Sequence, residues 1–237
     1  SYSVTGVQTC ALPIWEDAVI EHRWLIFDPL KGLKKHLPKK GKKKVQVFRF
    51  EEWQQLLAAM DEFYHPVATL MVMTGMIASE IAAIKQQHIR DGYLYIEESI
   101  VRDTEKDTLK NGYRERRIPI TAAIALVLEQ AKQQTQGEYL FTMKDGQTFT
   151  AELFQRRVWT KAMKQSGVLY RKPYSTRHTF AAWALAIRLD QNRLVGLMGH
   201  ASKQMVYEVY GQYVEGLEKD RMAILRYFGR DFLKGRG

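Results

Sequence analysis

Apolar residues recur at helical spacing along most of the chain after residue 45. The first stripe occupies positions i, i+3, i+4 and i+7, and its members are Trp53, Leu56, Leu57 and Met60. That spacing places them on one face of a helix that opens at Phe50. A second apolar helix is expected over Val67–Met73 and should stop near Gly75, because glycine readily adopts the left-handed backbone that follows many helices. A third helix is expected to begin at Ser79.

Two stretches change to β-branched and aromatic residues, Tyr93–Val101 and Tyr113–Ile120. They predict a small antiparallel sheet. Beyond it the helical period returns in five segments, which are Ala122–Gln134, Leu153–Gln165, Thr176–Ile187, Arg193–Met198 and Leu217–Phe228. Trp53 and Trp159 are expected in the core. The pattern therefore predicts a mainly α protein with a small three-stranded antiparallel sheet, which is an α+β fold.

Composition restricts the class of protein further. The chain has 237 residues, 46% of them hydrophobic and 26% charged, so it can bury at least one sizeable core. No apolar run approaches the roughly 18 residues of a membrane span, so a transmembrane protein is excluded. No membrane is expected among the partners. The one cysteine excludes a disulfide scaffold. Because phosphate-binding glycine loops and the His/Cys spacings of metal sites do not occur, we expect no metal and no other cofactor.

The net charge of +10 is concentrated in residues 31–44, which contain no acid and eight lysines: Lys31, Lys34, Lys35, Lys39, Lys40, Lys42, Lys43 and Lys44. With Pro38 and two glycines, this segment is predicted to be a mobile basic linker. A lysine-rich tether beside a folded domain favours contacts with phosphates. The candidate DNA-binding residues are therefore Lys39, Lys40, Lys42, Lys43 and Lys44. A solvated tether and an anionic membrane surface are the alternatives that charge alone leaves open.

The N-terminal residues need a different interpretation. Val4–Ile14 reads VTGVQTCALPI, which resembles one translated frame of a sequencing adapter. We interpret residues 1–14 as a non-native segment, so that Cys10 is not native and the natural chain continues upstream of Trp15. A signal peptide fits poorly, because no basic region precedes the apolar run. Before the linker, Glu16–Phe27 is expected to form one helix.

The C-terminal third contains the most informative motifs. Tyr174–Phe180 reads YSTRHTF, Leu197–His200 reads LMGH, and Tyr210 stands ten positions after His200. This succession resembles the tyrosine recombinase (phage integrase) family, whose catalytic domain carries HxxRH, then LGH, then a nucleophilic tyrosine nine or ten residues later.

Two earlier boxes resemble the same family. Thr74–Glu80 reads TGMIASE and is similar to TGxRxSE, while Lys110 ahead of Arg116–Pro119 resembles the family's hairpin lysine and the strand after it. The resemblance covers about Val45–Phe232. It implies the tyrosine recombinase catalytic-domain fold over residues 45–237, preceded by the linker at 31–44 and, at 15–30, by the remnant of an upstream core-DNA-binding domain.

The resemblance implies DNA cleavage and rejoining through a 3′-phosphotyrosine. Tyr210 would be the nucleophile, and Arg177 would hold the phosphate oxygens as their negative charge grows. Lys110 would protonate the departing 5′ oxygen, and His200 would donate a hydrogen bond to the phosphate. Tyr174 occupies the place of the family's first histidine. Because the phosphotyrosine retains the bond energy, rejoining would need neither ATP nor a metal.

Several alternatives remain open for these residues. Tyr207 is a second candidate nucleophile, and Lys106 is a second candidate acid. Both tyrosines also fit packed helix aromatics, and Arg177 fits a structural ion pair. His178 is predicted to be a hydrogen-bonded core histidine rather than a catalyst.

Two positions depart from the family pattern. Ile77 stands at the first catalytic arginine and carries neither a charge nor a donor, and Tyr174 replaces a histidine. Losing one preorganised donor to a developing oxyanion costs about 10²–10³ in rate. Three hypotheses follow: a recombinase or integrase impaired at Ile77, a non-catalytic DNA-binding relative, and a monomeric type IB topoisomerase-like enzyme.

The resemblance also implies partners and location. The expected partners are double-stranded DNA, further copies of the chain in a homotetramer on DNA, and accessory DNA-bending proteins. The expected setting is the cytoplasm of a bacterium, in association with the nucleoid, for a bacterial or phage-encoded protein. The apolar segment Leu217–Phe228 is expected to be an oligomerisation helix that contacts a neighbouring protomer, and docking on its own domain is the alternative.

Overall fold

The computed structural model describes residues 19–24, 46–101, 104–106, 115–135, 137–199, 210 and 215–234. The chain divides into two compact units, Ser1–Lys44 and Val45–Gly237. Residues 1–14 and the lysines of the predicted linker lie outside the described residues. In the first unit, Val19 and Ile20 are helical but residues 21–24 are not, so the helix expected over Glu16–Phe27 is wrong there. Arg23 has a φ of 50°, a left-handed backbone conformation that an α-helix cannot contain.

The second unit begins with three helices, α3 (Phe50–Ala58), α4 (His65–Thr74) and α5 (Ala78–Ala82). A short 3₁₀ turn, η1 (Glu62–Tyr64), leads into α4. The predicted stripe on α3 is confirmed, because Trp53 and Leu56 are fully buried. Helix α4 is buried on almost every side, which explains why it reads as a continuous apolar run rather than as a stripe.

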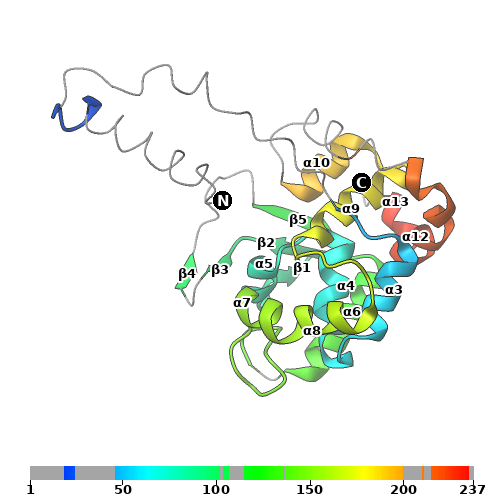
Figure 1. Ribbon diagram of the computed structural model, residues 1–237, viewed down its shortest axis with the longest axis horizontal. Coiled ribbons are helices and arrows are strands. Elements are labelled where there is room, and N and C mark those ends of the chain that lie inside the picture. Colours follow the sequence, from blue (N-terminus) through cyan, green and yellow to red (C-terminus); the bar gives the residue numbers. More distant parts are fainter. Residues whose placement is uncertain are drawn as a thin grey trace, which may run out of the picture. The chain divides into compact units, whose positions relative to one another are not determined.

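Gly75 ends α4 with a φ of 69°. A Cβ atom at this position would lie 2.5 Å from the ring of Phe180 on helix α9 (Ser175–Ala186). Glycine is therefore required twice, once for the left-handed backbone and once for the close approach of α9. Helices α4 and α9 lie side by side in the middle of the unit (Figure 1).

The predicted three-stranded antiparallel sheet is present, with strand order β1 (Ile89–Arg90), β2 (Tyr93–Ile96) and β5 (Arg116–Pro119). The stretch expected over Tyr93–Val101 is not one strand. It divides into β2 and β3 (Ser99–Val101), and β3 pairs with β4 (Thr104–Lys106) in a separate antiparallel hairpin. A 3₁₀ turn, η2 (Gln86–His88), precedes the sheet.

The remaining elements are helical and follow the sheet in the chain. They are α6 (Ala122–Gln134), α7 (Ala151–Leu153), the π-helical η4 (Phe154–Trp159), α8 (Thr160–Ser166), α9, α10 (Gln191–Met198), the 3₁₀ helix η5 (Glu215–Asp220), α12 (Arg221–Phe228) and α13 (Asp231–Lys234). The predicted fold class is confirmed. Trp159 is fully buried, as expected.

The C-terminal helices pack onto their own domain. Leu217, Ile224 and Phe228 are at most 1% exposed, and the ring of Phe228 lies 6.3 Å from that of Trp183 on α9. Trp53 donates from Nε1 to the Tyr227 hydroxyl at 3.0 Å. Aromatic residues of α3 and α9 thus cover these side chains within the domain, as in the docking alternative. Contact of this segment with a neighbouring protomer stays a prediction.

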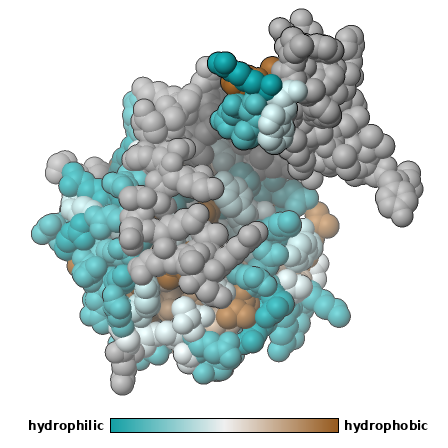
Figure 2. Space-filling model, turned by 90° about the vertical axis from the view of Figure 1, so that its left-hand side faces the viewer, coloured by the Kyte–Doolittle hydropathy of each residue, from teal (hydrophilic) through white to brown (hydrophobic). Residues whose placement is uncertain are grey.

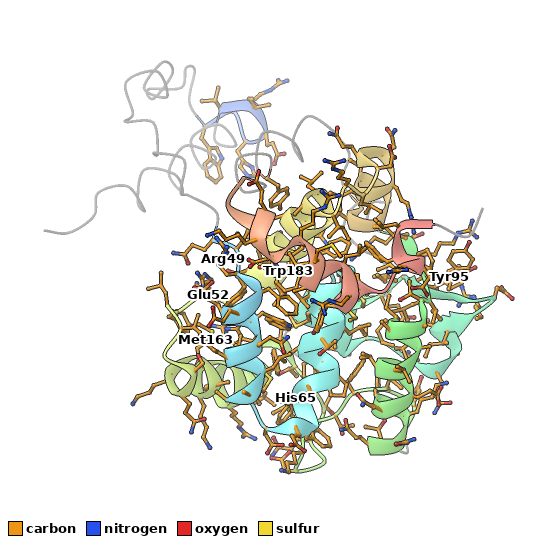
Figure 3. The ribbon with its side chains drawn as sticks, turned by 90° about the vertical axis from the view of Figure 1, so that its right-hand side faces the viewer. Arg49, Glu52, His65, Tyr95, Met163 and Trp183 are labelled. Atoms are coloured by element: carbon orange, nitrogen blue, oxygen red, sulfur yellow. The ribbon has the colours of Figure 1, made fainter. Side chains whose placement is uncertain are left out.

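Hydrogen bonds join the N-terminal end of the second unit to η5 and α9. Arg49 donates from Nε to the Asp220 carboxylate at 2.7 Å, and Figure 3 shows Arg49 and Trp183 beside the orange C-terminal segment. Trp183 donates from Nε1 to the Phe48 carbonyl at 2.9 Å. On the face in Figure 2, the described residues are mostly hydrophilic, with small hydrophobic patches. Among the described residues, no helix has the length and apolar character needed to cross a membrane.

Candidate active site

Arg177 lies on α9 with its guanidinium between the C-terminal ends of two other helices. It donates from Nη1 to the carbonyl oxygen of Gly75, after α4, at 2.8 Å, and from Nη2 to the carbonyl oxygen of Met198, the last residue of α10. Helix C-termini carry carbonyl groups without intrahelical partners, and their dipoles favour a cation. A guanidinium has five N–H donors, and these two bonds use two of them.

A second guanidinium is held beside the start of α5. Arg116 donates from Nη1 and Nη2 to the two carboxylate oxygens of Glu80, both at 2.9 Å, and from Nε to the Leu197 carbonyl at 2.8 Å. Both side chains of the ion pair are 3% exposed. Burial opposes ionisation of the Glu80 carboxyl, but the hydrogen bonds and charge of Arg116 outweigh burial, so its pKa is lowered.

The two arginines influence each other. The pKa of Arg177 is lowered, first by burial and then by the positive charge of Arg116, while Glu80 acts in the opposite direction. The carboxylate of Glu80 thus partly neutralises a site that holds two buried guanidinium groups. An arrangement of this kind is suited to an anionic ligand.

Sequence reasoning noted the motif Arg116–Pro119 but gave Arg116 no role. The signal was present in the strand alternation, since Arg116 and Ile118 are buried while Arg117 between them is exposed. An arginine on the inward face of a strand requires a buried acidic or carbonyl partner. Its partner, Glu80, lies 36 positions earlier in the chain, so local pattern does not identify it.

Ile77 precedes α5 and lies next to this ion pair. Its backbone N–H donates to Glu80 Oε2 at 3.0 Å, with φ −93° and ψ 159°. The side chain is half-buried, between the buried residues Met76 and Ala78. The isoleucine thus fits without backbone strain, but its side chain supplies no donor to a phosphate.

Tyr210 and His178 form the second part of the site. The Tyr210 side chain is 4% exposed, and its hydroxyl lies 2.8 Å from Nδ1 of His178 on α9. Burial, followed by the influence of Tyr174, raises the pKa of Tyr210 to about 12, while Arg177 acts to lower it. His178 is hydrogen-bonded, as expected, but its partner is the candidate nucleophile, a relationship that sequence reasoning missed because 32 positions separate the two residues.

Tyr174 stands at the edge of this group. Its side chain is 49% exposed, and its ring lies 5.0 Å from the ring of His178 in an edge-on contact. The structure therefore brings Tyr174, Arg177 and Tyr210 together around α9. Lys110, His200 and Tyr207 lie outside the described residues, as do the candidate DNA-binding lysines of the linker, and Lys106 is described only in its backbone, in β4.

Among the described residues, no group of three or more His, Cys, Asp or Glu side chains gathers as a metal site would. The chemistry available here is that of two arginines, a histidine and a buried phenol. Such a group can bind a phosphodiester and present a hydroxyl nucleophile to it.

Comparison with known proteins identifies relatives of this chain. The sequence model of the phage integrase family matches residues 46–215. The prophage integrase IntR of Escherichia coli K12 is 40% identical over 67 residues, which are 28% of this chain and 16% of that protein. The tyrosine recombinase XerC of Neisseria gonorrhoeae is 25% identical over 142 residues, which are 58% of this chain and 43% of that protein. The chain thus spans less than half the length of these curated relatives.

Solved structures with a similar fold include two integrases bound to DNA. The Tn1549 transposon integrase in complex with a circular intermediate DNA has a TM-score of 0.74 and 15% identity, covering 94% of this chain and 80% of that one. A lambda integrase tetramer bound to a Holliday junction has a TM-score of 0.67 and 17% identity, covering 86% of this chain and 57% of that one. At these identities the similarity establishes the fold.

Proposed function

The chain belongs to the phage integrase family of tyrosine recombinases, and we propose that it is a site-specific recombinase that breaks and rejoins DNA through a 3′-phosphotyrosine. The observation that carries this proposal is the placement of Tyr210 against α9, the helix that presents Arg177. The phenol of Tyr210 is buried and hydrogen-bonded to His178, and Arg177 lies on the same helix as His178. Together they supply the two components that phosphoryl transfer requires, a nucleophile and a cation for the phosphate oxygens.

In the proposed reaction, the Tyr210 oxygen attacks the scissile phosphorus and the bond to the 5′ oxygen breaks. Arg177 would hold a non-bridging oxygen through the donors that Gly75 and Met198 do not use. Lys110 would give the 5′ oxygen its proton, and His200 would donate to the phosphate. Attack of the 5′ hydroxyl on the phosphotyrosine reverses these steps and rejoins the strand, so no ATP or metal is consumed.

We further propose that Ile77 impairs this reaction. The arginine expected at this position would supply a second clamp for the phosphate, and Ile77 has no donor to replace it. Arg116 is committed to Glu80 by two hydrogen bonds and to Leu197 by a third. The rate of strand cleavage should therefore be reduced by about 10²–10³, as for other lost oxyanion donors.

The lack of a donor at Ile77 also favours a second candidate function, that of a non-catalytic DNA-binding relative. In that case the domain would bind duplex DNA but form no phosphotyrosine, even after the guanidinium at position 77 is restored. A type IB topoisomerase-like enzyme is the third candidate, and it would cleave without bringing two DNA sites together. Only the first candidate, the recombinase, would assemble as a homotetramer on DNA. It would do so with accessory DNA-bending proteins, in the bacterial cytoplasm beside the nucleoid.

A trapping experiment tests these candidates. The chain and its Ile77→Arg variant are incubated with a pool of nicked suicide duplexes with randomised arms, and covalent adducts are isolated and digested for mass spectrometry. The proposal expects the adduct on Tyr210 and its loss in Tyr210→Phe but not in Tyr207→Phe. Duplex binding without any adduct would support the non-catalytic candidate. Adducts that never join two duplexes in a synaptic complex would support the topoisomerase-like candidate.

A further inference from the structure

Within the part of the chain that the structure describes, the side chain of His178 lies in hydrogen-bonding contact with the reacting atom of Tyr210. Its Nδ1 atom lies 2.8 Å from the hydroxyl oxygen, and the two ring centroids are 5.7 Å apart. This distance is within the range at which a general base removes a proton. Because the tyrosine hydroxyl must lose its proton when the oxygen attacks phosphorus, the group at this position governs the reactivity of the nucleophile.

The surroundings of His178 favour its neutral form. Burial, followed by the positive charge of Arg177, lowers its pKa below the ordinary value of 6.5. A neutral imidazole has one nitrogen with a lone pair and one with a proton. At neutral pH the ring can therefore accept a hydrogen bond at Nδ1 while its proton is on Nε2.

Tyr210 cannot ionise unaided near neutral pH. Burial raises the pKa of Tyr210 to about 12, so the phenolate fraction at pH 7 is about 10⁻⁵. Tyr174, whose ring also lies against His178, carries a phenol rather than a basic nitrogen. Among these groups, the imidazole is the one with suitable basicity.

We propose that His178 is a catalytic base that takes the proton of Tyr210 as this residue attacks. This inference rests on the proposed function. As the bond from oxygen to phosphorus forms, the hydroxyl proton moves to Nδ1, which gives an imidazolium with protons on both nitrogens. The bond from phosphorus to the leaving oxygen breaks at the same time. In the reverse reaction, the imidazolium returns its proton to the tyrosine oxygen.

The assignment predicts a pH dependence with a definite direction. Among the described residues, the titratable and charged groups around the pair are Arg177 on the same helix and Tyr174 just before it, with Glu80 and Arg116 beyond Arg177. Because the pKa of His178 is lowered, the base stays available throughout the neutral range. Reactivity should be lost only on acidification through that lowered pKa, below 6.5.

The test uses a small phosphorus electrophile, 4-nitrophenyl methylphosphonate, which needs neither a DNA site nor a general acid because nitrophenolate leaves without a proton. Phosphonylation of Tyr210 is followed by nitrophenolate release and by mass spectrometry, from pH 5 to pH 10, in the Ile77→Arg chain. His178→Gln keeps a hydrogen-bond acceptor but removes the base. It should lower the rate at pH 7 by at least about 10²-fold, the usual contribution of general base catalysis.

The shape of the pH profile separates a base from a residue that merely positions Tyr210. With His178 the rate should be level from pH 7 to pH 9, whereas in His178→Gln it should rise about tenfold per pH unit with phenolate. The matched control is His65→Gln. His65 is also half-buried, but its Nε2 lies 2.8 Å from the Leu57 carbonyl, at the end of the domain opposite α10 in Figure 3. This variant should react at the unchanged rate.

Three results would overturn the assignment: an unchanged rate and profile in His178→Gln, a lower rate with an unchanged profile, or no phosphonylation of Tyr210 while His178 is present. Different results would contradict the proposed function, DNA cleavage. Phosphonylation that depends on His178, without any adduct on the suicide duplexes, would contradict DNA cleavage but not the base. DNA adducts that form equally well in His178→Gln would contradict the base alone.

Discussion

Arg177 donates from Nη1 to the carbonyl oxygen of Gly75 at 2.8 Å, across 102 positions of the chain. This bond joins two of the family boxes, because Gly75 belongs to TGMIASE and Arg177 to YSTRHTF. It holds the guanidinium at Gly75, two positions before Ile77, where the second arginine is missing. The geometry of the site therefore depends on the close contact between the end of α4 and α9.

That contact predicts that Gly75→Ala lowers the free energy of unfolding by more than backbone strain alone would. The substitution forces a positive φ on alanine and also places a methyl group 2.5 Å from the Phe180 ring. Gly167→Ala is the matched control, because Gly167 has a φ of 70° but no atom within 4 Å of the added Cβ. The control should lose about 1–2 kcal/mol from backbone strain, and Gly75→Ala should lose about 1–3 kcal/mol more from overpacking.

Urea unfolding of the two alanine variants, followed by circular dichroism, measures both losses. Equal destabilisation of the two variants would contradict the close approach of α9 to Gly75.

The buried ion pair predicts a large effect of Glu80→Gln. Removing one partner leaves the charge of Arg116 buried and uncompensated, which costs about 3–5 kcal/mol in free energy of unfolding. Glu97→Gln is the control, because its partner Arg90 lies 2.6 Å away but both side chains are about 40% exposed. The control should cost no more than about 1 kcal/mol.

The same pair predicts how stability depends on pH. Because the pKa of Glu80 is lowered from 4.5, its contribution to stability is present above pH 4.5 and is lost as the pH falls through the lower folded value. Unfolding free energies measured between pH 3 and pH 6 should show this loss in the native chain and a smaller one in Glu80→Gln. Identical pH profiles would show that the carboxylate is not held by Arg116.

The packing of the C-terminal helices predicts that Phe228→Ala destabilises the domain. Phe228 is 1% exposed, and its ring stacks on Phe232 at 4.5 Å, so the cavity should cost about 3–5 kcal/mol. Met222→Ala on the same helix should change stability by less than about 0.5 kcal/mol, since Met222 is 61% exposed. Truncation after Gly216 should unfold the domain. A truncated chain that folds and binds single sites but fails to multimerise would support the oligomerisation role and contradict this prediction.

The lysine-rich segment remains a prediction from the sequence and is tested by salt dependence. Replacing Lys39, Lys40, Lys42 and Lys43 with glutamine should flatten the log–log dependence of DNA affinity on salt, by up to about 3.6 units if each lysine contacts one phosphate. Lys132→Gln is the control, because that side chain is paired with Glu129 at 2.8 Å in the second unit, Val45–Gly237. An unchanged slope in the fourfold variant would make the segment a solvated tether.

The spacing of apolar residues predicts a helix well where an N-capping residue precedes a continuous apolar face. Helix α6 has the predicted bounds, Ala122–Gln134, because Thr121 caps its first turn and apolar residues follow at helical spacing. The segment Leu153–Gln165 was predicted as one helix, but Phe154–Trp159 is π-helical. A single wider turn alters few apolar positions, so the sequence pattern does not reveal it.

The site was predicted only as far as the family boxes extend. Tyr174, Arg177 and Tyr210 were identified from motifs, and the structure places them around one helix. The role of Arg116 and the bond from His178 to Tyr210 were missed, because each depends on a contact between distant segments. Hydrogen bonds of this kind follow from the packing of helices rather than from local sequence.

The most direct test of the account compares the rate of covalent trapping in the native chain with that in Ile77→Arg, on a suicide duplex selected from the pool. We expect little or no phosphotyrosine from the native chain, an increase of at least about 10²-fold in Ile77→Arg, and no adduct in Ile77→Arg combined with Tyr210→Phe. Circular dichroism should show that all three chains are folded. Robust cleavage by the native chain, at a rate that Ile77→Arg does not increase, would contradict an impaired site and show that another cation already occupies the place of the missing arginine.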